Sequence, residues 1–213
     1  MLPSLGKEQV DAVAGFALCL LPAALPVWLI ATRPFGGEAL ALGLAVGVLV
    51  AVGFSLPGLQ TPAAPFKVLA GATAGTLLGR QFLYRRWLLV GAVVALVVDL
   101  YSVFRGPTRL VVEHAPRTLD FLLVQFPSLG SDRAGFGLGV SDFLFLALFV
   151  AGSRRCGLHA RASLAAMLAG VLATVVAAAI LDRALPALPL LCLAFILVNA
   201  DRFIRSDTTC HER

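Results

Sequence analysis

The sequence predicts an all-α polytopic membrane protein that forms a single transmembrane domain over residues 1–213. Hydrophobic residues make up 59% of the chain, charged residues only 14%, and the mean hydropathy is +0.92. A water-soluble core cannot hide so much apolar surface, which excludes a soluble globular domain. The apolar residues form about seven continuous blocks, whereas a transmembrane β-barrel requires short alternating segments.

The N-terminal part, residues 1–86, contains the first three predicted transmembrane helices. These cover residues 12–31, 39–56 and 66–78. The first is long enough to span, and Pro22 and Pro26 interrupt it, so we expect a retained helix and not a signal peptide. The prolines of residues 60–65 predict a loop before the third. Near the start of that segment, Lys67 is expected to extend its ammonium group toward the headgroups.

The C-terminal part, residues 87–204, contains four more predicted helices, and a short polar tail follows at residues 205–213. The helices cover residues 87–104, 136–152, 162–181 and 185–200. One substantial polar region, residues 105–132, separates the first two of them. Within it, residues 119–126 are apolar but too short to span, so we expect them at the interface or against the protein.

The charged residues and cysteines exclude several function classes. Although the net charge is +5, the basic residues lie between apolar spans, where they anchor loops at lipid headgroups and do not indicate nucleic acid. Nearly all are arginine, a bias typical of GC-rich prokaryotic genomes, so we expect a prokaryotic cell membrane. The four cysteines include no Cys-x-x-Cys pair and no histidine at ligand spacing, so we expect no metal site and no cofactor. Cys19 and Cys192 are interpreted as packing residues.

Asp99 and Asp142 are the only ionisable acids within the apolar segments. A carboxylate at membrane depth costs roughly 2.5–3.5 kcal/mol on insertion scales, so it usually persists because it has a function. Both lie on the side of the polar region that joins their helices, and therefore at similar depth. Since helices joined in this way commonly pack as neighbours, we expect the two carboxylates to meet.

Paired carboxylates suit the hydrolysis of peptide bonds. Two carboxylates at close range cannot easily both ionise, and the pair then shares one proton. The ionised member takes a proton from water while the protonated member donates to the scissile carbonyl, without a metal or a covalent intermediate. For the aspartates alone, two alternatives remain open: a proton or cation relay in a transporter, and a structural role satisfied by hydroxyls and backbone.

Blocks in the C-terminal part resemble the presenilin and signal-peptide-peptidase family of intramembrane aspartyl proteases. Residues 97–103, Val-Val-Asp-Leu-Tyr-Ser-Val, resemble the first catalytic segment, and residues 106–113 are similar to the Gly-Pro-x-Arg-x-Leu-Val-Glu that follows it in presenilins. Residues 139–145 are similar to the Gly-x-Gly-Asp-Phe-x-Phe block of the second aspartate. The Pro-Ala-Leu motif of the family is matched by Pro186, Ala187 and Leu188.

The resemblance implies an endopeptidase that cleaves peptide bonds in or near transmembrane segments, with Asp99 and Asp142 as the catalytic pair. It also implies that the last four helices form a presenilin-like catalytic core. The substrate would be a transmembrane peptide or a membrane protein that pairs, in extended form, with a strand near the second aspartate. The residues implied to bind substrate are Gly139, Val140, Ser141, Pro186, Ala187 and Leu188.

The chain also departs from the family pattern. Ser141 replaces the second glycine of Gly-x-Gly-Asp, and Val98 stands where presenilins carry a tyrosine. Seven spans are predicted where presenilin has nine. Ser141 keeps open a non-proteolytic membrane protein on the same scaffold, such as a transporter, a channel or a degenerate binding module. A prepilin-type peptidase is a third hypothesis, disfavoured by the Pro-Ala-Leu block and the absence of Cys-x-x-Cys.

The orientation in the membrane stays open from the sequence. If the region between Asp99 and Asp142 is cytoplasmic, as in presenilins, seven basic residues lie inside and ten outside. The positive-inside rule therefore favours the opposite orientation, that of signal peptide peptidases, by a small margin. No feature of the sequence indicates an oligomeric state.

Overall fold

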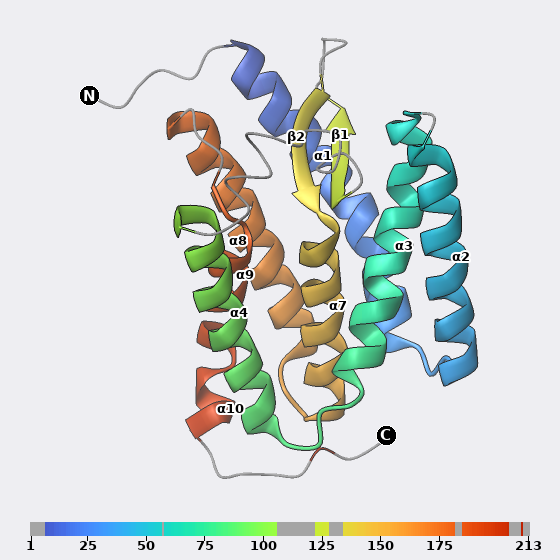
Figure 1. Ribbon diagram of the computed structural model, residues 1–213. Coiled ribbons are helices and arrows are strands. Elements are labelled where there is room, and N and C mark those ends of the chain that lie inside the picture. The colour runs from blue at the N-terminus through green and yellow to red at the C-terminus, as the bar shows by residue number, and fades with distance from the viewer. Residues whose placement is uncertain are drawn as a thin grey trace.

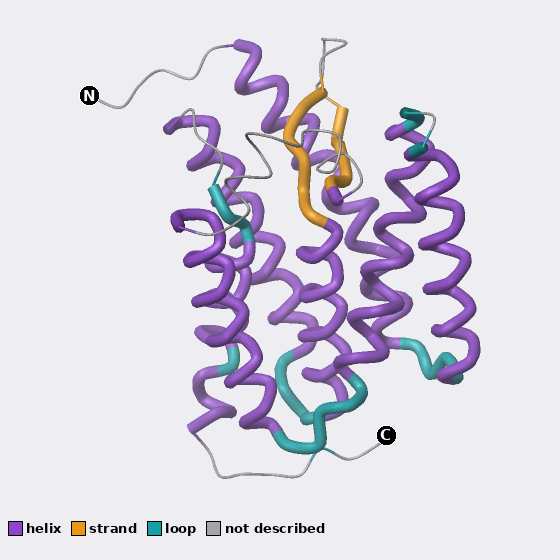
Figure 2. Tube along the Cα trace, viewed as in Figure 1, coloured by secondary structure: helices purple, strands orange, loops and turns teal. Residues whose placement is uncertain are grey.

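The computed structural model describes residues 7–56, 58–105, 122–127, 134–181, 185–204 and 210, and nearly all of them are helical. The helices and the two strands are arranged as one bundle with a small hairpin at one end (Figures 1 and 2). The helices are α1 (Lys7–Thr32), α2 (Gly37–Ser55), α3 (Gln60–Gly79), α4 (Arg85–Arg105), α7 (Val140–Arg155), α8 (Ala160–Leu181), α9 (Leu188–Val198) and α10 (Ala200–Ile204). The strands are β1 (Leu123–Pro127) and β2 (Ala134–Gly139).

Within the described residues, three helices are long and apolar enough to cross a membrane: α1, α2 and α8. The most apolar stretch of α2 has a mean hydropathy of 2.0, yet only 17% of it is buried inside the protein. A water-soluble protein does not expose a helix of this kind. The outward-facing apolar surface therefore indicates a membrane protein.

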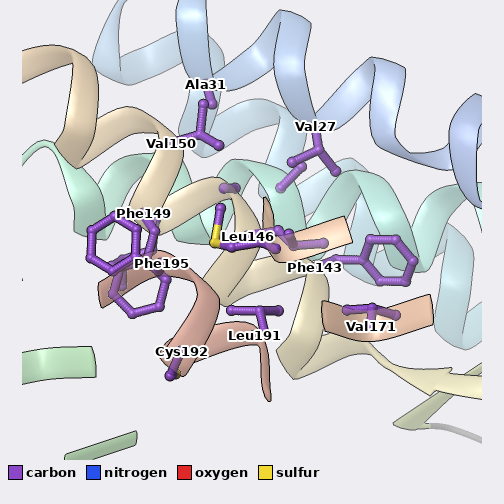
Figure 3. Packing of buried hydrophobic residues seen from close by; sticks show 14 of the residues in the cluster. Val27, Ala31, Phe143, Leu146, Phe149, Val150, Val171, Leu191, Cys192 and Phe195 are labelled. Atoms are coloured by element: carbon purple, nitrogen blue, oxygen red, sulfur yellow. The ribbon is translucent and has the colours of Figure 1, made fainter. Parts of the chain in front are cut away.

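The core lies around α7, which occupies the middle of the bundle (Figure 1). Most of its side chains are buried, and Phe149 stacks on Phe195 of α9 with ring centroids 4.4 Å apart. Figure 3 shows buried residues of α1, α8 and α9 packed around it. The labelled members of this cluster are Val27, Ala31, Phe143, Leu146, Phe149, Val150, Val171, Leu191, Cys192 and Phe195.

The prediction of an all-α fold is wrong at the hairpin. Strands β1 and β2 pair antiparallel, and the helix predicted from residue 136 begins only at Val140. Glycines at 135, 137 and 139 alternate with Phe136 and Leu138, which disfavours a helix and suits the two-residue period of a strand. The hairpin packs through Phe126 against Phe16 of α1, with ring centroids 4.9 Å apart.

Two predictions about α3 are also wrong. The loop expected at residues 60–65 is the beginning of the helix, since a proline in the first helical turn, such as Pro62, removes no intrahelical hydrogen bond. Lys67 does not extend toward the headgroups, because it is only 3% exposed. Its ammonium group donates to the Gln60 side chain at 2.8 Å and to the Leu123 carbonyl of β1 at 2.9 Å. Lys67 thus fastens the hairpin to α3.

Helices α3 and α7 pack closely because α3 carries glycines four residues apart, at Gly71, Gly75 and Gly79. A Cβ atom added at Gly75 would lie 2.0 Å from the Leu144 carbonyl oxygen. Small residues at this spacing let two helix backbones approach each other, as in many membrane proteins. The contact fixes α7, and with it Asp142, against the N-terminal part of the chain.

Candidate active site

Asp142 lies where β2 passes directly into α7, in the first turn of the helix. Its carboxylate accepts a hydrogen bond from the Gly139 backbone N–H at 2.9 Å, and the residue is only 7% exposed. The N-terminus of a helix favours a negative charge, because its backbone N–H groups lack intrahelical partners. The junction of strand and helix therefore holds the carboxylate in one position.

Asp99 lies on α4 and is half-buried. The Leu188 backbone N–H lies close enough to its carboxylate to interact with the negative charge. Leu188 is the first residue of α9 and the last of the Pro-Ala-Leu segment. Pro189 is the second residue of α9, where proline fits the helical backbone, and the Leu188 N–H before it has no partner within the helix.

These contacts bring three distant segments of the chain to one place. Asp99 is close enough to Asp142 for its charge to act on that carboxyl group. Both charges also act on Cys192, which lies one turn after Leu188 and is fully buried. The site thus combines an acid from α4, an acid from α7 and the beginning of α9.

The two acid-bearing helices are not packed along their length as the sequence argument expected. Instead, α4 packs mainly against α9. It meets α7 at the end away from the acids, where the Leu88 side chain fills the space that a Cβ on Gly152 would need. The short apolar helix α9, with Leu191 and Phe195 fully buried, lies against both α4 and α7 and so sets the position of Asp99.

The residues implied to bind substrate lie on two segments, one beside Asp142 and one beside Asp99. Ser141 is exposed, next to Asp142, while Val140 is half-buried against α3. A Cβ atom on Gly139 would lie 3.0 Å from the Ser141 hydroxyl oxygen and 3.2 Å from a carboxylate oxygen of Asp142, so this position requires a small residue. Pro186 and Ala187 are half-buried, and Leu188 is buried.

Among the described residues, no cluster of three or more histidine, cysteine or acidic side chains could hold a metal ion. The segment at residues 106–113, which resembles the Gly-Pro-x-Arg block of presenilins, lies outside the described residues.

Sequence reasoning missed the residues that hold the hairpin, and through it Asp142, in position. Lys67 binds the Leu123 carbonyl, and Leu123 is paired with Gly139, whose N–H holds Asp142. A lysine inside an apolar segment and a glycine at every fourth residue after it are the signals that point to this support.

A comparison of the chain with protein-family models and with curated proteins found no match. The function is therefore inferred from the arrangement of residues in this chain.

Proposed function

We propose that this chain is an intramembrane aspartyl endopeptidase that hydrolyses peptide bonds in or near transmembrane segments. The observation that carries the proposal is the meeting of Asp99, Asp142 and Leu188 at one end of the bundle. These residues belong to three separate motifs, and a shared catalytic task would explain why they come together.

The proposed reaction uses the two aspartates as a general acid and a general base. The ionised carboxylate takes a proton from water as the water oxygen attacks the scissile carbonyl carbon. The protonated carboxyl donates its proton to the carbonyl oxygen, which gives a tetrahedral diol. Proton transfer to the amide nitrogen then breaks the C–N bond and releases the two fragments. The chemistry requires no metal and no cofactor.

A substrate helix must unwind before its peptide bonds can be attacked, and its freed backbone groups then need partners. Among the described residues, β2 pairs with β1 along one edge, and no other strand pairs with its second edge. The other edge of β2 ends at Gly139, three residues before Asp142. An extended substrate segment paired with this edge would present its peptide bonds beside the carboxylates.

We further propose that α1 to α4, α7, α8 and the segment that contains α9 span a prokaryotic cell membrane, with α4, α7, α8 and α9 as a presenilin-like catalytic core. The helices alternate in direction along the chain (Figure 1). Several large apolar side chains on α4 also face outward, as contact with lipid would require. The most exposed of these are Trp87, Val94, Val97, Val98 and Tyr101.

A second candidate is a non-proteolytic membrane protein on the same scaffold, such as a transporter, a channel or a binding module. The hydrogen bond from Gly139 favours it, because an acid in the first turn of a helix can act purely as a cap. Ser141, in place of a glycine next to Asp142, favours it as well.

Cleavage assays separate the two candidates. Purified protein in liposomes is tested against a panel of transmembrane peptides, beside Asp99→Asn, Asp142→Asn and a transition-state inhibitor of aspartyl proteases. We expect cleavage that each substitution and the inhibitor abolish. If wild-type protein that is monodisperse and helical cleaves nothing, Ser141→Gly is tested next. Continued inactivity of that variant contradicts the proposal and favours the second candidate.

A further inference from the structure

The end of the bundle opposite the hairpin carries a disulfide bond between Cys156 and Cys210, which are 54 residues apart in the sequence. Cys156 ends α7, and both cysteines are buried. Sequence analysis gave this pair no role. The remaining cysteines, Cys19 and Cys192, are free.

Hydrogen bonds around the disulfide join three connections of the chain into one unit, here called the clasp. The Cys210 backbone N–H donates to the Leu83 carbonyl at 2.8 Å. The Arg85 guanidinium donates to the Cys156 carbonyl through Nη2 at 3.0 Å, and to the Arg202 carbonyl through Nη1 at 3.0 Å. The clasp thus joins the end of α7, the connection from α3 to α4, and α10.

We propose that the clasp lies on the oxidising side of the membrane, so that the hairpin end, with Asp99 and Asp142, lies on the cytoplasmic side. Protein disulfides persist in oxidising compartments and are rare in the cytoplasm, where thiols are kept reduced. Helix α7 runs from Asp142 at the hairpin end to Cys156 in the clasp (Figure 1). The two ends of a spanning α7 therefore lie on opposite sides of the membrane.

The bond forms by thiol–disulfide exchange with an oxidised dithiol carrier of that compartment. One cysteine thiolate attacks the disulfide of the carrier and gives a mixed disulfide, which the second thiolate resolves. The carrier leaves as a dithiol with the two electrons, and the chain ends with one new S–S bond. Only a clasp that faces this carrier can be oxidised in this way.

The proposal opposes the positive-inside count, which favours the arginine-rich end as cytoplasmic. Several of those arginines have a local structural task instead. Arg80 donates to the carbonyls of Phe35 and Arg33, and Arg85 donates to two carbonyls of the clasp. Arg202 pairs with Asp201 on α10. Such arginines are required at this end by the helix termini, whichever side of the membrane it faces.

The first test measures the thiol state, independently of any protease activity. Bacterial cells that express the chain are quenched in acid, denatured, and treated with a maleimide–polyethylene glycol reagent before or after reduction. We expect two tags without reduction and four after it. In Cys156→Ser, Cys210 becomes reactive and the count without reduction rises to three. Four tags on wild-type protein without reduction overturn the proposal.

The second test measures the orientation. Leu59 lies between α2 and α3 at the hairpin end, and Arg161 lies in the first turn of α8 at the clasp end; both are exposed. In a chain with all four cysteines replaced, Leu59→Cys and Arg161→Cys are labelled with a membrane-impermeant maleimide. In intact spheroplasts we expect Arg161→Cys to react, and Leu59→Cys to react only after permeabilisation.

The opposite labelling pattern overturns the proposal. If the cysteine-free chain does not fold, a reporter protein is fused instead to the C-terminus of the wild-type chain, so that Cys210 is kept. Alkaline phosphatase fused there should be active and green fluorescent protein dark, because the fusion would lie outside the cytoplasm. Inactive phosphatase with bright fluorescence overturns the proposal. Since neither test uses cleavage, failure of the orientation and failure of the proposed function are distinguishable.

Discussion

The two ends of the bundle stabilise their helix termini with side chains of opposite charge. At the hairpin end, helices α7 and α9 begin, and their surplus backbone N–H groups are matched by the carboxylates of Asp142 and Asp99. At the clasp end, α7 stops, and the guanidinium of Arg85 donates to the Cys156 carbonyl next to a covalent cross-link. The clasp end is therefore fixed by a covalent bond, whereas the hairpin end is held by carboxylates that can also exchange protons.

The largest expected effect tests whether Asp142 does more than cap its helix. In Asp142→Asn, the amide oxygen can still accept from Gly139, but the side chain cannot exchange a proton. We expect cleavage to fall by roughly 10²–10⁴-fold with little change in thermal stability. Asp142→Ala loses the cap as well, and unfolding in detergent should show an additional loss of about 1 kcal/mol. Retained cleavage in Asp142→Asn would assign the residue to the structural role only.

The second largest effect tests whether the disulfide of the clasp stabilises the fold without taking part in cleavage. Replacing Cys156 and Cys210 by serine opens a closed loop, which costs about 2–4 kcal/mol. For a chain of this length, the unfolding midpoint should fall by roughly 4–16 °C. Cleavage at lower temperature should stay close to the wild-type rate, because the disulfide is far from the acids. Equal stability of wild type and the serine variant under non-reducing conditions would show that the disulfide does not stabilise the fold.

The packing of α3 on α7 predicts a matched pair of glycine substitutions. Gly75→Ala places a Cβ against the Leu144 carbonyl oxygen and should destabilise the protein by about 1–3 kcal/mol. Because α7 must shift, cleavage should fall as well. Gly53 on α2 has open space around it, so Gly53→Ala should be neutral or slightly stabilising. Denaturation midpoints that are the same for both variants would show that the close approach is not needed.

A smaller effect tests the support behind the hairpin. Lys67→Met keeps the length of the side chain but removes the donor to the Leu123 carbonyl, at an expected cost of about 1–3 kcal/mol. The loss should be local, so hydrogen exchange should quicken at Val124 and Leu138 of the hairpin and stay unchanged in the core of α7. Unchanged exchange in the hairpin would contradict the role assigned to Lys67.

The smallest effect concerns Ser141, which is exposed at the hairpin end. Ser141→Gly should leave the free energy of unfolding within about 0.5 kcal/mol of wild type. It should change the order of preference within a panel of peptide substrates, because it enlarges the space beside Asp142. Identical preferences for both proteins would exclude Ser141 as a determinant of specificity.

The membrane class, the approximate positions of the helices and the two acids of interest could all be predicted from the sequence. These follow from hydropathy and composition, which act over short stretches of chain. The sequence also placed Pro186 at the start of a helix, because proline acts locally on the backbone.

Which segments of the chain lie next to one another could not be predicted in the same way. The hairpin, the contact of Leu188 with Asp99 and the burial of Lys67 all depend on groups that lie far apart in the chain. The pairing of Cys156 with Cys210 was undetermined as well, because spacing alone does not say which of four cysteines form a disulfide. Hydropathy records how each residue interacts with lipid or water, whereas a site forms from interactions between residues, which become defined only when the helices pack.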